Sequence, residues 1–242
     1  MLIVGSYNLQ NKFKLKKYNG RFNNQDNVLL LKKFLDDYNI DILGTQEFVY
    51  WYLERARKVI NDKYSINGKY RYPLLVLKKY DEANSIICKE TVTECKTCHL
   101  PFLPNVIPRI LTKAYIDTKE FGLITFYNTH LSVKNDKVKK KQLNSILDNI
   151  KKETNPIILT GDFNMTINNP LFKEFINELE KIGVKRVNVL EKTYKTHSKN
   201  NAIDHIFVSK KMNILKYKVI KDDKYKDFSD HYPIIVFLNR VK

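Results

Sequence analysis

The sequence predicts a single α/β domain, spanning residues 1–242, in which mixed β-sheets are covered by helices. At 242 residues the chain can form one large hydrophobic core, and it is short for two independent domains. Apolar, strand-like runs alternate with segments of helical spacing in each half of the chain. Several strand-like runs also follow one another without a helix between them, which excludes a purely parallel, doubly wound sheet.

The composition is that of an ordinary globular protein, with 43% hydrophobic and 29% charged residues. No apolar stretch is long enough to span a bilayer. The opening M-L-I-V-G-S-Y-N-L lacks the basic start and long apolar run of a secretion signal. We therefore expect a cytoplasmic protein without a transmembrane segment, whose first residues form a strand.

The formal net charge of +17 indicates a polyanionic partner, because such a surface attracts phosphate backbones or anionic lipid head groups. Lys far outnumbers Arg among the 43 basic residues, and Asn and Ile are abundant, as an A/T-rich coding sequence would also produce. Both explanations stay open on composition alone, so the positions of the charges have to decide between them.

The three cysteines, Cys88, Cys95 and Cys98, lie close together in the sequence. The run C-K-T-C-H, which ends at His99, matches a haem attachment site, and with Cys88 it could form a zinc site. Haem attachment requires export, and the run lies between two expected strands. The sequence therefore favours reduced, structural cysteines.

The first strand is expected over residues 2–9, with Asn8 near its end. The loop after it, N-K-F-K-L-K-K-Y-N-G-R-F-N-N, interleaves lysines with aromatic residues. This composition is typical of a loop that contacts phosphates, and an ordinary solvated loop is the alternative. A helix follows from Asn24, its expected cap, with apolar residues at helical spacing: Val28, Leu31, Phe34 and Leu35.

The next strand is expected over residues 40–45, so that Glu47 lies just beyond its end. A solvent-facing Glu ahead of the next helix is the alternative. Residues 48–60 carry aromatic side chains at helical spacing, which indicates core packing.

Strands are expected next over residues 74–77, 85–88, 91–96, 109–117 and 123–131, with Glu82 between the first two. The last of them alternates, L-I-T-F-Y-N-T-H-L, and places His130 near its end. A histidine in that position is also common as a plain core or edge residue. A helix over residues 136–151 follows, with an apolar inner face and a Lys-rich outer face.

The run N-P-I-I-L-T-G-D-F-N predicts a short buried strand that ends at Asp162, with Asn164 two residues later. Gly, Asp and Asn also favour turns, so this run alone is ambiguous. After a helix near residues 171–179, Asp204 precedes an apolar strand in I-D-H-I-F-V-S. Asp230 and His231 lead into the last strand, residues 234–238.

Polar residues thus recur at the ends of apolar strands, the edge at which open α/β sheets bind ligands: Asn8, Glu47, Glu82, His130, Asp162, Asn164, Asp204, Asp230 and His231. Their motifs are S-Y-N-L, T-Q-E, E-A-N-S-I, N-T-H-L, T-G-D-F-N, I-D-H-I-F-V-S and S-D-H-Y-P. Their order resembles that of the endonuclease/exonuclease/phosphatase superfamily. This group contains pancreatic-type deoxyribonuclease, exonuclease III-like repair nucleases, neutral sphingomyelinases and inositol polyphosphate 5-phosphatases.

The resemblance implies a four-layer α/β/β/α sandwich and a Mg²⁺-dependent phosphoesterase, with Mn²⁺ as a substitute. It implies that Glu47 binds the metal, and that Asn8 and Asp230 help to hold it. Asp162 and Asn164 would position the attacking water and the phosphate.

The resemblance further implies that Asp204 pairs with His231 and that Glu82 pairs with His130. Asn8, Arg109 and Asn164 would contact the substrate.

These residue types suit the chemistry. Mg²⁺ is a hard ion that prefers oxygen ligands and keeps several waters, so one or two carboxylates suffice. A carboxylate bonded to one imidazole nitrogen fixes the tautomer and favours the charged ring. Either Asp162 or His231 could take the proton of the attacking water, and the sequence leaves this open.

The substrate class also stays open. His130 in N-T-H-L resembles the deoxyribonuclease and sphingomyelinase branches more than the repair nucleases. Lysines flank the expected site in three loops: Lys12, Lys14, Lys16 and Lys17; Lys192, Lys195 and Lys199; and Lys221, Lys224 and Lys226. We expect a nuclease acting on DNA or RNA. The alternatives are an enzyme for lipid head groups or small phosphate esters, and a binding module without activity.

Overall fold

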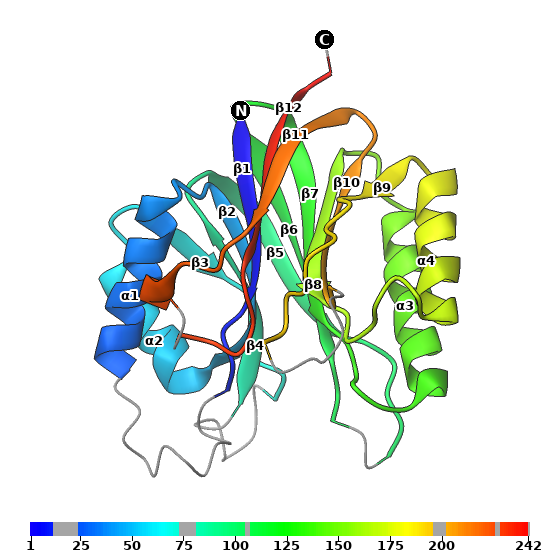
Figure 1. Cartoon of the computed structure of the whole chain (residues 1–242), viewed down its shortest axis with the longest axis horizontal. Coiled ribbons are helices and arrows are strands. Elements are labelled where there is room, and N and C mark those ends of the chain that lie inside the picture. The colour runs from blue at the N-terminus through cyan, green and yellow to red at the C-terminus, as the bar shows by residue number, and fades with distance from the viewer. Residues whose placement is uncertain (12–23, 73–80, 105–106, 196–201, 226–227, 242) are drawn as a thin grey trace.

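The computed structural model describes residues 1–11, 24–72, 81–104, 107–195, 202–225 and 228–241, with the backbone alone for residues 24–26. Two mixed β-sheets pack face to face between two pairs of helices (Figure 1). The four-layer sandwich implied by the resemblance is therefore confirmed. No helix among the described residues is both long and apolar enough to cross a membrane.

The first sheet has the order β11-β12-β1-β2-β4-β3. Its strands are β11 (Met212–Val219), β12 (Ile234–Arg240), β1 (Leu2–Asn8), β2 (Ile42–Val49), β4 (Glu82–Cys88) and β3 (Ser65–Asn67). Helices α1 (Asn24–Asp37) and α2 (Tyr50–Val59) cover its outer face, and a short 3-10 helix spans Asp223–Tyr225.

The second sheet has the order β5-β6-β7-β8-β10-β9. Its strands are β5 (Thr91–His99), β6 (Ile110–Thr118), β7 (Gly122–His130), β8 (Ile157–Asp162), β10 (Asp204–Ser209) and β9 (Val184–Arg186). Helices α3 (Asp136–Ile150) and α4 (Pro170–Lys181) cover its outer face.

The expected helices all form, and their apolar stripes face the sheets. In α1 the side chains of Val28, Leu31, Phe34 and Leu35 are all fully buried, as the helical spacing predicted. The sequence did not predict β3, β9 and β11. β3 and β9 have three residues each, and β11 lies at a sheet edge with alternating exposed side chains. The strand expected over residues 74–77 lies outside the described residues.

The layer between the two sheets changes in polarity along its length. Alternate residues of β7 face inward, and they run from Ile124 and Phe126 through Asn128 to His130. In β8 the corresponding series is Ile158, Thr160 and Asp162. The inner face is thus apolar at one end, neutral and polar in the middle, and ionisable at the other end.

The strand directions bring the ionisable ends together. β7 and β8 are parallel, so His130 and Asp162 lie opposite each other at their last residues. β10 runs antiparallel to β8, and its first residue, Asp204, also pairs with Asp162. β1 of the facing sheet ends at Asn8, at the edge away from the chain termini (lower edge in Figure 1).

Candidate active site

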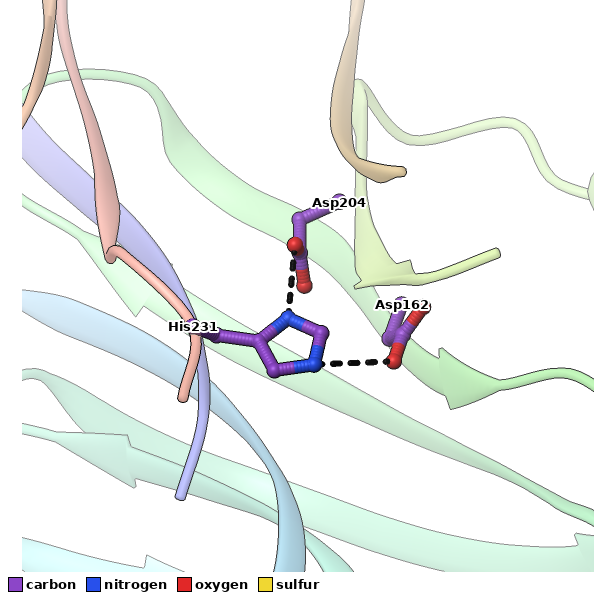
Figure 2. Close-up of side chains that lie close together, drawn as sticks. All are labelled: Asp162, Asp204 and His231. Carbon is purple, nitrogen blue, oxygen red and sulfur yellow. Dashed lines mark hydrogen bonds and ion pairs between the residues drawn. The ribbon is translucent and has the colours of Figure 1, made fainter. Parts of the chain in front are cut away.

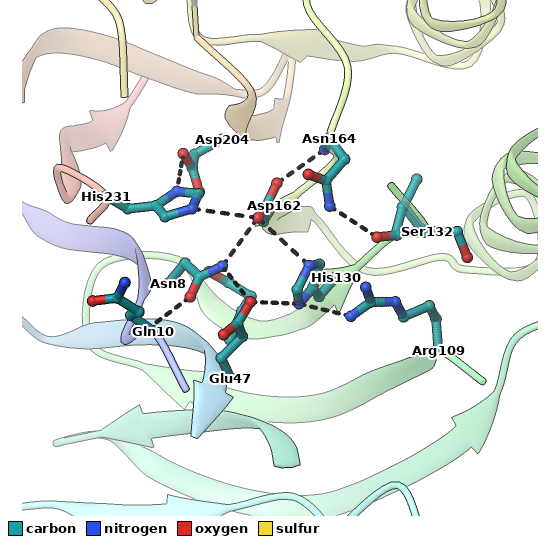
Figure 3. Close-up of polar contacts among 12 residues, drawn as sticks. Asn8, Gln10, Glu47, Arg109, His130, Ser132, Asp162, Asn164, Asp204 and His231 are labelled. Atoms are coloured by element: carbon teal, nitrogen blue, oxygen red, sulfur yellow. Dashed lines mark hydrogen bonds and ion pairs between the residues drawn. The ribbon is translucent and has the colours of Figure 1, made fainter. Parts of the chain in front are cut away.

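A cavity of about 310 Å³ lies at this edge, between the ends of the two sheets. Its lining consists of Glu47, Arg109, His130, Val133, Asp162, Asn164, Tyr194, Ile203, Asp230 and His231. Seven of these were expected site residues. Asn8 and Asp204 contact this lining directly (Figure 3). The structure thus gathers side chains that are far apart in the sequence.

Asp162 is at the centre of the polar contacts and is only 2% exposed. Its Oδ2 accepts a hydrogen bond from Asn8 Nδ2 at 3.0 Å, and its Oδ1 accepts one from the backbone N–H of Asn164 at 2.9 Å. Burial, together with the charge of Asp204, raises the pKa of Asp162 to about 7, although His231, Asn164 and Asn8 act against this rise. A carboxyl with this pKa can exchange a proton near neutral pH.

His231 lies between two carboxylates (Figure 2). Its Nδ1 donates to Asp204 Oδ2 at 2.9 Å, and its Nε2 is 3.8 Å from Asp162 Oδ2. Burial acts to lower the pKa of His231, but Asp204 and then Asp162 and Asp230 outweigh it and raise the pKa to about 10. The Asp204–His231 pair expected from the resemblance is present, and it favours a cationic imidazole.

Residues that the sequence did not single out hold this pair in place. The Thr193 hydroxyl accepts hydrogen bonds from the backbone N–H groups of Ile203 and Asp204, each at 3.1 Å. The Ser229 hydroxyl accepts from His231 N at 3.0 Å and donates to the Asn8 carbonyl at 2.6 Å. Only the Ser of S-D-H-Y-P could have drawn attention to this role.

Glu47 reaches the site because β2 contains a bulge. The strand does not end near Thr45 as expected; it continues to Val49, and its pairing with β4 shifts between Thr45 and Phe48. Glu47 in the bulge has φ 55°. Such a bulge redirects a side chain that would otherwise follow the strand alternation.

The Glu47 carboxylate is held at the site edge by groups at the end of β1 and just after it. Its Oε2 accepts from the backbone N–H of Asn11 at 2.6 Å, and its Oε1 is 3.4 Å from Asn8 Nδ2. His130 Nδ1 lies 4.0 Å from Oε1. Asn8 therefore connects Glu47 of the first sheet to Asp162 of the second.

Glu82 has partners other than the expected His130. Its carboxylate pairs with the Arg71 guanidinium and accepts a hydrogen bond from Asn11 Nδ2 at 2.6 Å. Arg71 gave no signal in the sequence, because it lies outside any strand or helix pattern. The expected Glu82–His130 pair stays a prediction, and the contacts found for Glu82 are those with Arg71 and Asn11.

His130 contacts Arg109 and Asp162 instead. Arg109 Nη1 lies 3.0 Å from His130 Nδ1, and since a guanidinium only donates, Nδ1 accepts this hydrogen bond. His130 Nε2 therefore carries hydrogen and faces Asp162 Oδ2 at 3.6 Å. Burial, the larger cause, and the charge of Arg71, the smaller, lower the pKa of Arg109 from its ordinary value. The Nε atom of Arg109 is buried without a hydrogen-bond partner among the described residues.

Asn164 and Asp230 complete the expected set. Asn164 adopts φ 51°, and its Nδ2 donates to the Leu131 carbonyl at 3.0 Å, which fixes the turn after β8 against the end of β7. Asp230 is partly exposed at the cavity, and its Oδ1 is 4.0 Å from His231 Nε2.

The donor set suits a hard divalent cation. Ligand atoms of Asp162, Asp204 and His231 lie within 4.8 Å of one another. His231 is the least suited of them, because its raised pKa and its bond to Asp204 keep the ring protonated. The oxygen atoms of Glu47, Asn8, Asp162 and Asp230 are the better ligands for Mg²⁺ or Mn²⁺. Asp204 Oδ1 is also buried without a hydrogen-bond partner in the described part of the chain.

The three cysteines are free thiols. Cys88 is buried in β4, whereas Cys95 and Cys98 lie on β5, and burial raises the pKa of Cys95 to about 11. His99 Nε2 contacts the Arg71 carbonyl at 2.7 Å. These residues are part of the sheet framework.

The flanking lysines are only partly within the described residues. Lys12, Lys14, Lys16, Lys17, Lys199 and Lys226 lie outside them. Lys195 follows Tyr194 of the cavity wall, and its Nζ is 5.1 Å from the centroid of the Tyr232 ring. Lys221 Nζ is 5.8 Å from the same centroid. Lys224 pairs with Asp37, on α1.

The sequence matches a known protein family. The model of the Endonuclease/Exonuclease/phosphatase family matches residues 5–231. No curated protein matches the sequence.

Several solved structures share the fold. A mannosyl-6-phosphatase from Bacteroides thetaiotaomicron is similar with a TM-score of 0.82 and 23% identity, over 98% of this chain and 99% of that one. The human Nocturnin catalytic domain with a bound sulfate has a TM-score of 0.77 and 16% identity, over 99% and 94% of the two chains. D. rerio TDP2 in complex with a single-stranded DNA product has a TM-score of 0.73 and 20% identity, over 98% of each chain.

Proposed function

This chain belongs to the endonuclease/exonuclease/phosphatase family, and from that premise we propose that it is a divalent-metal-dependent hydrolase of phosphate esters. The observation that carries the proposal is the contact of His231 with Asp204 at 2.9 Å and with Asp162 at 3.8 Å, inside a cavity rimmed by further carboxylates. Buried, mutually perturbed ionisable groups in a cleft are typical of catalytic sites.

The metal site would be formed by Glu47, with Asn8 and Asp230 in support. Oxygen ligands on three separate strands or loops leave positions for water and for substrate, as Mg²⁺ requires. When bound, the ion supplies positive charge to a phosphoryl oxygen and offsets the charge that grows during attack by water.

Asp162 and His231 would divide the proton chemistry. The pKa of Asp162 is raised to about 7, which makes it the better acceptor for the proton of the attacking water. The pKa of His231 is raised to about 10, so its ring is cationic and can donate from Nε2 to a phosphoryl oxygen. Asp204 keeps the proton of Nδ1 in place, and Asn164 would orient the phosphate.

His130 and Arg109 would bind the substrate at the opposite wall of the cavity. Arg109 is 9% exposed, lines the cavity, and has a buried Nε without a partner among the described residues. An incoming phosphoryl oxygen would provide both an acceptor and a countercharge for this guanidinium. Glu82 would act indirectly, through Arg71 and Asn11.

Nucleic acid is the first substrate class that we propose. The net charge of +17, together with Lys195 and Lys221, which lie over the ring of Tyr232 next to His231, supports an extended phosphate-rich substrate. Tyr194, whose ring lies 4.8 Å from that of His231 on the cavity wall, offers an aromatic face to a base.

A small phosphorylated metabolite or a lipid head group is the second candidate. The cavity of about 310 Å³ is of a size for one small ligand, and a similar structure is that of a mannosyl-6-phosphatase. A binding module without activity is the least supported, because the carboxylates and both histidines converge on one cavity.

The decisive experiment is a substrate screen with Mg²⁺ and Mn²⁺. Plasmid DNA, single-stranded RNA, a sphingomyelin-type lipid and small phosphate esters are compared, with Glu47→Gln as the inactive control. Nicking of plasmid or cleavage of RNA supports the nuclease. Turnover of a small ester without any cleavage of nucleic acid supports the second candidate. No turnover of any substrate by the metal-loaded protein contradicts both.

A further inference from the structure

A fully buried amide joins the two sheets directly behind the candidate active site. Asn128 Oδ1 accepts hydrogen bonds from Gln46 Nε2 at 2.7 Å and from the Thr160 hydroxyl at 3.1 Å. Its Nδ2 donates to the carbonyls of Thr45 at 2.7 Å and Ser85 at 3.0 Å. Both hydrogens of the amide are therefore used. The single Thr160 hydroxyl hydrogen is shared between Asn128 Oδ1 and the Tyr127 carbonyl at 3.2 Å, and the partners of the amide come from both sheets.

The position of this amide in the fold relates it to the site. Asn128 is two residues before His130 on β7, and Thr160 is two residues before Asp162 on β8. Because the side-chain period of a strand is two, each lies on the same face as its site residue, one step further inside. Gln46 directly precedes Glu47 on β2.

The two carbonyls that Asn128 binds flank the bulge that directs Glu47. Thr45 and Ser85 are the last regular pair of β2 and β4, and the next pair is Phe48 with Ala83. A bulge interrupts the ladder of hydrogen bonds between the strands, so nearby carbonyls need other donors. The Asn128 amide donates to both carbonyls, and the Thr45 hydroxyl also donates to the Ser85 carbonyl at 3.2 Å.

The backbone of β2 lies close to side chains of the second sheet at this point. A Cβ on Gly44, which precedes Thr45 on β2, would lie 2.1 Å from Thr160 Oγ1 and 2.8 Å from Asn128 Oδ1. Only glycine leaves room for this contact. β2 therefore lies close against Thr160 and Asn128, just behind Glu47 and Asp162.

We propose that Asn128 is a positioning residue of the active site: through Thr45, Ser85 and Gln46 it fixes the β2 bulge, and so the placement of Glu47 relative to Asp162. This inference rests on the proposed function in taking Glu47 as a metal ligand. Asn128 touches neither metal nor substrate. Its replacement therefore weakens the metal site without removing a ligand, as is usual for groups that orient metal ligands.

The test compares Asn128→Ala and the milder Asn128→Ser with Ile124→Ala as a matched control. Ile124 lies on the same face of the same strand, at the apolar end of the inter-sheet layer. Each variant is first checked for cooperative thermal unfolding. Mn²⁺ binding is then measured by isothermal titration calorimetry, and amide hydrogen exchange at Asn11 reports on Glu47, which accepts the Asn11 N–H at 2.6 Å.

We expect both Asn128 variants to bind Mn²⁺ about tenfold more weakly than the wild type and to exchange the Asn11 amide faster. Ile124→Ala lowers the melting temperature without either effect. The inference is overturned if the Asn128 variants lose only thermal stability, as the control does, or if Ile124→Ala weakens Mn²⁺ binding equally. If the wild type binds no Mn²⁺, the proposed metal dependence fails, and the Asn11 exchange rate alone decides the positioning role.

Discussion

His231 and Asp204 form a hydrogen bond of 2.9 Å between imidazole Nδ1 and carboxylate Oδ2, although 27 residues separate them in the sequence. Both side chains are almost fully buried, so neither charge is screened by solvent. The pair therefore sets the protonation state of the site.

Asp204→Asn is expected to lower the pKa of His231 from about 10 toward its ordinary value of 6.5, because Asp204 is the largest cause of the rise. Activity should fall about a hundredfold or more, since a neutral ring with a changed tautomer is a poor donor to phosphate. A pH titration of the His231 ring signals by NMR measures the shift. An unchanged pKa would contradict the assigned role of Asp204.

Glu47→Gln, Asp162→Asn and His231→Ala should each lose activity about a hundredfold or more with the fold preserved. Glu47→Gln removes the charge of the proposed metal ligand and should therefore also weaken Mn²⁺ binding. His231→Ala should retain most metal binding. Steady-state rates and calorimetric titration distinguish the variants, with Glu94→Gln on the exposed edge strand β5 as the control. Near-normal turnover in any of the three would show that the residue assignment is wrong.

Cleavage of nucleic acid should depend steeply on salt, with a loss of roughly tenfold or more between low and physiological ionic strength. The double variant Lys195→Ala/Lys221→Ala, whose side chains lie over the ring of Tyr232 next to His231, should flatten this dependence. Lys141→Ala/Lys152→Ala removes the same charge from exposed positions on α3 and in the turn after it, and should leave the slope unchanged. Rates measured over a salt series test this, and a flat response of the wild type would count against a polymeric substrate.

Gly161→Ala should destabilise the fold by about 1–3 kcal/mol and displace Asp162. A Cβ at this position would lie 2.4 Å from the Thr129 carbonyl, so β7 and β8 would have to separate. Gly5→Ala is the control, since its nearest contact is the movable end of Leu43 at 2.7 Å. Denaturant unfolding measures the unfolding free energy of both variants. Equal, small losses of stability would show that β7 and β8 can separate at little cost.

His205 should make the protein less stable in mild acid. Its ring is buried among Phe163, Phe172 and Phe207, and burial lowers its pKa from 6.5 to about 4. The unfolded chain therefore binds a proton between pH 6.5 and 4 that the folded chain does not, so stability falls as the pH is lowered through this window. The shift corresponds to at most about 3 kcal/mol.

The comparison with His205→Gln isolates this effect. Gln does not titrate and can still donate to the Met165 carbonyl, which His205 Nε2 contacts at 2.9 Å. The raised pKa of Asp162 acts in the opposite direction in the same window, but it does so in both proteins and cancels in the difference. The unfolding free energy of the wild type minus that of His205→Gln should decrease as the pH falls from 6.5 to 4. A constant difference would contradict the buried, neutral state of His205.

The sequence alone determined the four helices, most of the strands and the residue types of the site. Apolar spacing predicted α1 and α3, and alternation predicted β7, because burying one face against a core imposes a period on the side chains. The order of the polar motifs predicted the family and the four layers. Asp162 and Asp204 could be assigned to one site because Asp162 ends one buried strand and Asp204 begins another.

Only the tertiary structure decided the contacts between these elements. No local pattern marks Arg71 as the partner of Glu82, or Asn128 as the link between the sheets, because their partners are distant in the sequence. The bulge that directs Glu47 arises from pairing with β4, and the glycines at 44 and 161 serve close approach of strands and not turns. The pKa values of Asp162 and His231 follow from burial and facing charges, which exist only once the sheets have packed.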